Sequence, residues 1–170
     1  TAGAMADELK LGHFMSANHA LHRKLMTPWA NQVAATSKNA LTVRVFPSSQ
    51  LGGKPASSYK MAADGIADIA FGIPGYTSSQ FPGLNLTELP GFAGNQSEAQ
   101  ATEELWNKFK FFEKEFPGTK VLVLLSGDLS VIVTKNKPIR TPADLKGLRI
   151  RVPTREQGEL VEYFGGVVSN

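Results

Sequence analysis

The chain has 170 residues, of which 42% are hydrophobic and 19% are charged. This length and balance suit one or two domains with a packed core, and they argue against an intrinsically disordered chain. Eighteen Lys and Arg residues stand against 15 Asp and Glu residues, a formal net charge of +3. That excess is mild and the basic residues are scattered. The sequence has no Lys/Arg-rich block with interleaved aromatic residues, so we expect no nucleic-acid partner.

The sequence contains no cysteine, which excludes disulfides, zinc–thiolate sites and thiol nucleophiles. No apolar run is long enough to span a bilayer, and no covalent membrane anchor is evident. Ala4-Met5-Ala6 has the small-x-small form of a signal-peptidase site. The same residues fit a cloning remnant equally well, and both interpretations stay open.

The first half of the chain alternates strands and helices. Strand patterns cover residues 9–12, 41–46 and 68–73, and helix patterns cover 19–37 and 56–63. Pro28 lies inside the first helix pattern, where we expect it to kink the helix or mark a boundary. The last of these strands is rich in small residues, which leave room for close approach.

The second half begins with residues 74–96, which are rich in Pro, Gly, Ser and Asn and predict mostly loop. Capping-box sequences at Ser97 and Thr154 predict helix starts, and Thr141-Pro142-Ala143-Asp144 predicts a short capped helix. Strands are predicted at 120–125, 130–134 and 148–152, the first of them buried on both faces. A further strand is expected after Gly165-Gly166, and the end of the sequence soon afterwards suggests a truncated chain.

The alternation of strands and helices predicts an α/β fold with a largely parallel sheet. Sequence motifs for catalysis and nucleotide binding are missing: there is no Gly-x-Ser-x-Gly elbow, no Gly-x-Gly-x-x-Gly and no phosphate loop. His19 and His22 have a helical spacing that can chelate a metal, but no acidic residue falls at a matching turn. We therefore expect no enzyme, no metal site and no cofactor.

Four stretches, in this order and spacing, resemble the solute-binding subunits of tripartite ATP-independent periplasmic (TRAP) transporters. They are Val43-Arg44-Val45-Phe46-Pro47-Ser48-Ser49-Gln50-Leu51-Gly52, Asp64-Gly65-Ile66-Ala67-Asp68-Ile69-Ala70-Phe71, the stretch from Leu86 to Phe92 with Leu89-Pro90, and Thr141-Pro142-Ala143-Asp144-Leu145-Lys146-Gly147-Leu148-Arg149-Ile150-Arg151-Val152-Pro153. The resemblance implies a type II-like periplasmic-binding-protein fold with two α/β lobes. It places the first lobe at residues 1–123, and the hinge strand with the start of an incomplete second lobe at 124–170.

The resemblance also implies a periplasmic protein that captures a small organic carboxylate by closure of its lobes and hands it to TRAP membrane subunits. A ligand-sensing extracytoplasmic domain of a signalling protein is the alternative. The family's main ligand contact is an Arg before Val-Pro, which matches Arg151. A guanidinium supplies two parallel donors to a carboxylate and keeps its charge. Arg149 lies on the same face of the predicted strand.

Other ligand contacts carry over less directly from the family. His13 and Phe14 follow the first strand, and Phe71, Gly72 and Ile73 stand where some relatives place an acidic residue. An apolar pocket around one carboxylate suits an aromatic or branched-chain acid better than a polyhydroxylated one, which is our hypothesis for the ligand.

Overall fold

A computed structural model of the protein describes residues 7–89, 91–94, 97–108, 110–126 and 131–169. The chain forms two compact units, Thr1–Ile73 and Pro74–Asn170, called here the first and the second unit. The lobe boundary expected near residue 123 stays a prediction. The Ala4-Met5-Ala6 motif lies outside the described residues.

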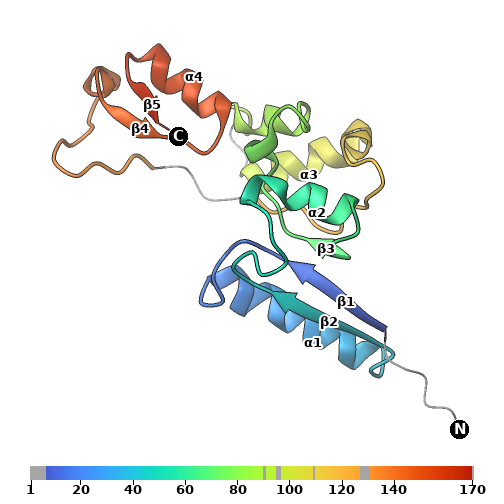
Figure 1. Ribbon diagram of the computed structural model, residues 1–170. Coiled ribbons are helices and arrows are strands. Elements are labelled where there is room, and N and C mark those ends of the chain that lie inside the picture. The colour runs from blue at the N-terminus through green and yellow to red at the C-terminus, as the bar shows by residue number, and fades with distance from the viewer. Residues whose placement is uncertain (1–6, 90, 95–96, 109, 127–130, 170) are drawn as a thin grey trace, which may run out of the picture. The chain divides into compact units, whose positions relative to one another are not determined.

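The first unit is built on a parallel sheet of β1 (Asp7–Gly12), β2 (Leu41–Phe46) and β3 (Ile69–Ala70), in the order β2-β1-β3 (Figure 1). Leu11 pairs with Val45 on one side and with Ile69 on the other, and its side chain is buried in the core. The predicted parallel arrangement is therefore confirmed, although β3 is shorter than the strand expected over 68–73.

The helix that joins β1 to β2 changes its winding where Pro28 enters it. A π-helical turn at His22–Met26 leads into α1 (Thr27–Thr36), and the Thr27 amide donates to the carbonyl of His22, five residues back. Pro28 has no amide hydrogen and its ring crowds the carbonyl four residues earlier, so a wider turn relieves the clash. The boundary expected at Pro28 is confirmed.

The return from β2 to β3 passes through a 3₁₀ turn at Pro55–Ser57 and α2 (Ser58–Ala63). α2 packs closely on the sheet at Gly12, where an added Cβ would lie 2.8 Å from Met61 Sδ. Met61 and Ala67 are buried at this contact.

The second unit begins with two 3₁₀ helices, Pro74–Thr77 and Leu84–Glu88, in the segment expected to be mostly loop. α3 (Glu98–Lys108) follows, and a 3₁₀ helix at Lys110–Glu115 comes after it. The capping box at Ser97 is confirmed: the Gln100 amide donates to Ser97 Oγ (3.3 Å) and the Ser97 amide donates to Gln100 Oε1 (3.4 Å). Phe81, Leu84 and Phe112 form the buried core of this part.

Two strand predictions are wrong. Residues 120–126 and 131–134 form no strand, and residue 130 lies outside the described part of the chain. Leu122 and Val123 are more than 60% exposed and Val131 is 80% exposed. An apolar, β-branched run favours a strand only when a neighbouring strand pairs with it, and no described residue does so here.

The second unit ends in a strand–helix–strand motif. β4 (Arg149–Arg151) and β5 (Val167–Ser169) pair in parallel and are joined by α4 (Arg155–Tyr163), as expected for the strand after Gly165-Gly166. Thr154 caps α4, since its Oγ1 accepts from the Gln157 amide (3.3 Å). The capping box predicted there is only half formed, because the Gln157 side chain donates to Glu88 Oε2 instead (3.2 Å).

Candidate functional site

β4 separates a basic face from an apolar face. Arg149 and Arg151 are exposed, whereas Ile150 between them is half-buried. The alternation of side chains along a strand places both guanidinium groups on one side of the sheet. The prediction that Arg149 and Arg151 lie on the same face of this strand is therefore confirmed.

α4 covers the opposite, apolar face of this sheet. A Cβ added at Gly158 would lie 3.4 Å from Val168 Cγ2 and 3.5 Å from Val152 Cγ2. Val168 pairs with Ile150 in the β4–β5 register, so the helix lies on the side that Ile150 occupies. Arg149 and Arg151 are left on the side that α4 does not cover.

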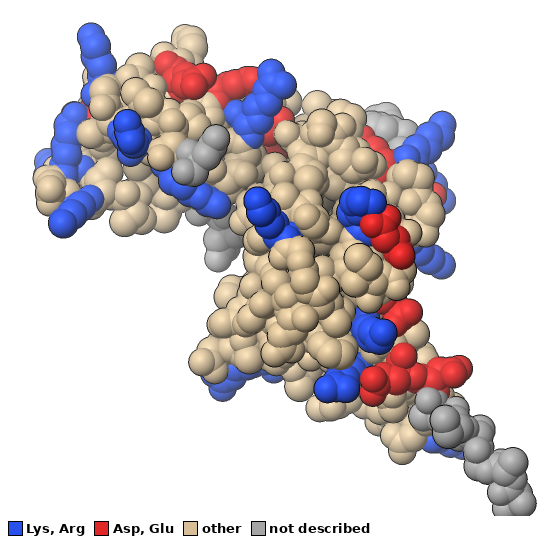
Figure 2. Space-filling model, in the orientation of Figure 1, with Lys and Arg blue, Asp and Glu red and all other residues tan. Residues whose placement is uncertain are grey.

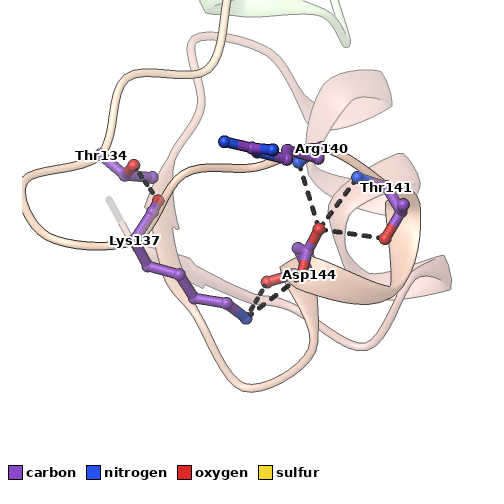
Figure 3. A network of polar contacts seen from close by, with 5 residues as sticks. All are labelled: Thr134, Lys137, Arg140, Thr141 and Asp144. Atoms are coloured by element: carbon purple, nitrogen blue, oxygen red, sulfur yellow. Dashed lines mark hydrogen bonds and ion pairs between the residues drawn. The ribbon is translucent and has the colours of Figure 1, made fainter.

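The segment before β4 is held by Asp144, in the short helix Pro142–Leu145. Its Oδ2 accepts from the amide of Thr141 (2.9 Å), the hydroxyl of Thr141 (3.0 Å) and the amide of Arg140 (3.1 Å) (Figure 3). The Thr141 amide bond lowers the pKa of Asp144 most, followed by the Arg140 amide, because both favour the ionised carboxylate. The capped helix predicted here is confirmed.

Lys137 and Thr134 extend this network toward the preceding loop. Lys137 Nζ donates to the Asp144 carbonyl (2.7 Å) and lies 3.9 Å from its Oδ1, and Thr134 Oγ1 donates to the Lys137 carbonyl. In Figure 3 the guanidinium of Arg140 extends away from the Asp144 carboxylate, and only the Arg140 backbone bonds to it.

The two arginines of β4 are free of acidic partners in the part of the chain that the structure describes. Within the described residues, Arg149 and Arg151 make no ion pair. The sequence also allows Arg151 to be an ordinary strand arginine that is solvated or salt-bridged. No salt bridge is observed among the described residues, and the exposed side chain fits a solvated arginine as well as a ligand-binding one. A permanently charged and unpaired guanidinium on an exposed strand face is suited to bind an anion.

The remaining candidate residues lie at the carboxyl edge of the sheet in the first unit. Phe14 follows β1 and Phe71 follows β3, and the Phe71 amide donates to the Gly12 carbonyl (3.0 Å). Their half-buried rings are 6.0 Å apart with a tilt of 47°, a normal aromatic pair. Gly72 and Ile73 continue from Phe71, Gly72 exposed and Ile73 half-buried.

His13 belongs to the same edge, but it points into the unit. Its side chain is only 3% exposed, and its Nε2 lies 2.9 Å from Nδ1 of His22. Burial lowers the pKa of His13 most, and the neighbouring His22 and His19 lower it further, while an interaction with the Met15 backbone opposes them. Its Nδ1 is buried and makes no full hydrogen bond.

Sequence reasoning missed the partner of His13. It paired His22 with His19, one helical turn away, as a possible chelate. The structure pairs His22 with His13 instead, while His19 Nδ1 accepts from the Leu21 amide (3.2 Å). Throughout the described ranges, no three His, Cys, Asp or Glu side chains gather in a group that could hold a metal ion, and no helix there is long and apolar enough to cross a membrane.

Comparison with known protein families matches residues 11–170 to bacterial extracellular solute-binding protein, family 7. The chain belongs to this family. A curated solute-binding protein from Albidiferax ferrireducens is 26% identical over 149 residues, which are 85% of this chain and 43% of the relative.

Two solved structures of family members resemble the chain over nearly its whole length. A TRAP solute-binding protein from Rhodoferax ferrireducens, in complex with copurified benzoate, is 32% identical with a TM-score of 0.80, over 96% of this chain and 50% of its own. A marine metagenome TRAP solute-binding protein specific for aromatic acid ligands, in complex with 3-hydroxybenzoate, is 30% identical with a TM-score of 0.82, over 97% and 51%. The chain thus spans about half the length of these relatives. Over that half it has the fold of the family, whose members have two lobes. Nothing in these matches supports the signalling alternative.

Proposed function

We propose that this protein is a periplasmic solute-binding protein that captures an aromatic monocarboxylate and delivers it to TRAP membrane subunits. The observation that carries the proposal is the likeness, at 30% identity or more, to two TRAP solute-binding proteins with bound benzoate and 3-hydroxybenzoate. No catalytic step is part of this function, since capture needs only binding and release.

In this proposal Arg151 holds the carboxylate of the ligand. The exposed guanidinium stands on the uncovered face of β4 and has no ionic partner among the residues that the structure describes. A bidentate pair with a carboxylate would use its two parallel donors. Arg149, two residues earlier on the same face, adds positive charge beside that pair.

Phe14 and Phe71 are the proposed contacts for the apolar part of the ligand. Their rings already lie against each other at the carboxyl edge of a parallel sheet, the edge where α/β proteins bind ligands. Gly72 and Ile73 place no charge next to them. Such surroundings suit an aromatic ring, and they leave the hydroxyl groups of a sugar acid without partners. His13 lies buried at the same edge, in contact with His22.

Isothermal titration calorimetry with the full-length protein tests the proposal. Benzoate and 3-hydroxybenzoate are the expected ligands, and benzamide, which keeps the ring but carries no charge, is the matched control. We expect saturable binding of the two acids, with benzamide at least tenfold weaker. Preference for galacturonate over both aromatic acids would contradict the aromatic assignment, and binding of no carboxylate would contradict the function.

A further inference from the structure

The basic residues of this chain are concentrated in one short segment. Residues 131–153 carry six basic residues and one acidic residue, a net charge of +5, whereas the rest of the sequence has 12 basic and 14 acidic residues. The expectation that the basic residues are scattered is therefore wrong for this segment of the sequence. Figure 2 shows Lys and Arg side chains gathered over the part of the second unit that carries β4.

All six basic side chains of this segment are exposed: Lys135, Lys137, Arg140, Lys146, Arg149 and Arg151. Four of them lie outside β4, and we call Lys135, Lys137, Arg140 and Lys146 the flanking cations. Among the residues with described positions, only Lys137 has an ion pair, and that pair is long, at 3.9 Å. Lys135, Arg140 and Lys146 thus have no ion-pair partner among the described residues, although α4 behind β4 carries Glu156, Glu159 and Glu162.

The single acidic residue is already engaged with the backbone. Asp144 accepts hydrogen bonds from the amides of Arg140 and Thr141 and from the Thr141 hydroxyl (Figure 3). Its carboxylate therefore caps the short helix and fixes the residues directly before it. The same bonds fix the loop from Lys137 to Thr141 directly before the short helix that leads into β4. Lys137 and Arg140 are therefore held in a fixed loop that precedes Arg149 and Arg151 in the chain.

We propose that the flanking cations form an electrostatic funnel that steers an anionic solute toward Arg151 without contacting the bound ligand. The inference rests on the proposed function, because it assumes that the solute is a carboxylate. A surface of one sign raises the local concentration of an oppositely charged solute and speeds its association. Between exposed charges this effect is long-ranged at low salt and screened within about 3 Å at 1 M.

Stopped-flow kinetics of benzoate association, followed by intrinsic tryptophan fluorescence, test the funnel. The test variant replaces the four flanking cations by Gln (Lys135, Lys137, Arg140 and Lys146). The matched control replaces one Arg and three Lys, also exposed, in the first unit by Gln (Arg23, Lys24, Lys38 and Lys54). Both variants lose the same charge and leave Arg149 and Arg151 in place.

At about 10 mM ionic strength we expect the association rate constant of the test variant to fall about tenfold, the lower end of the range for electrostatic steering. The dissociation rate constant should stay within about twofold, and the difference from wild type should vanish near 0.5 M salt, where the charges are screened. The control variant should keep the wild-type association rate.

An unchanged association rate, an equal fall in the control variant, or a fall that persists at high salt would overturn the funnel. If the fourfold variant fails to fold, as judged by circular dichroism, Lys135→Gln with Lys146→Gln tests the same point, because neither side chain bonds to Asp144. If calorimetry shows that the wild-type protein does not bind benzoate, that result would instead contradict the proposed function itself.

Discussion

Arg151 has two properties that suit a carboxylate-binding residue. Its side of β4 is left free by α4, and no described carboxylate neutralises it. We expect Arg151→Ala to weaken carboxylate binding by about 2–5 kcal/mol, the cost of removing one partner of a buried charge pair. Calorimetry with benzoate measures this loss.

Arg140→Ala is the control for the loss of one positive charge at this surface. Its guanidinium extends away from Asp144 (Figure 3), so benzoate affinity at physiological salt should stay within about threefold of wild type. Equal affinities of the Arg151→Ala variant and the wild type, in a folded protein, would refute the role given to Arg151.

The His13–His22 pair links the stability of the first unit to pH. The pKa of His13 is lowered in the folded state from its ordinary value of 6.5, so the unfolded chain binds the proton more readily. Stability is therefore full above pH 6.5 and falls as the pH drops below it. Urea unfolding between pH 8 and pH 5 should show this loss, and His13→Gln should reduce it.

His19→Gln is the matched control for His13, because His19 contributes least among the three factors that lower the pKa of His13. This variant should keep most of the pH dependence. The linkage would be disproved by a wild-type stability that does not change between pH 7 and pH 5, or by a His13→Gln variant with the full wild-type dependence.

At the scale of single residues, the sequence was informative where local geometry decides. The exposed pair Arg149 and Arg151 follows from strand alternation, and the closeness of Phe14 and Phe71 follows from their places after neighbouring parallel strands. The partner of His13 could not be predicted, because His13 and His22 are nine residues apart, on different elements, and meet only in the folded chain.

Glu115 joins two elements of the second unit. Its Oε1 accepts from the Gly83 amide (2.5 Å) and its Oε2 accepts from the Leu84 amide (3.2 Å), at the start of the 3₁₀ helix Leu84–Glu88. Glu115→Ala should lower the free energy of unfolding by about 1–3 kcal/mol, since it leaves two partly buried amides without an acceptor. Denaturant unfolding measures the change.

Glu113→Ala provides the comparison within the same 3₁₀ helix, because Glu113 is exposed. Its stability should stay within about 0.5 kcal/mol of wild type, as for most surface substitutions. The joining role of Glu115 would be wrong if both variants lost the same stability.

The elements that the sequence predicts well are those with local signals. Ser97, Thr141 and Thr154 each cap the helix that they were expected to start. The Gln157 side chain departs from its expected place because Glu88, 69 residues away in the chain, offers an acceptor. The strands expected at 120–125 and 130–134 fail for the opposite reason, since pairing partners are a tertiary property.

At the scale of the whole molecule, the order of strands and helices gave the α/β class, and the four family motifs gave the solute-binding family. Family membership is confirmed over residues 11–170. The charge distribution was not visible in composition, because a net charge of +3 conceals a strongly basic segment and a slightly acidic remainder. Only the folded chain shows those cations exposed around β4.

The central claim is that Arg151 binds the carboxylate of an aromatic acid. A crystal structure of the full-length protein with benzoate tests this claim most directly. The account predicts both benzoate oxygens within about 3 Å of the Arg151 guanidinium nitrogens, in a bidentate pair. Benzoate bound elsewhere, with Arg151 facing solvent or paired to a protein carboxylate, would contradict it.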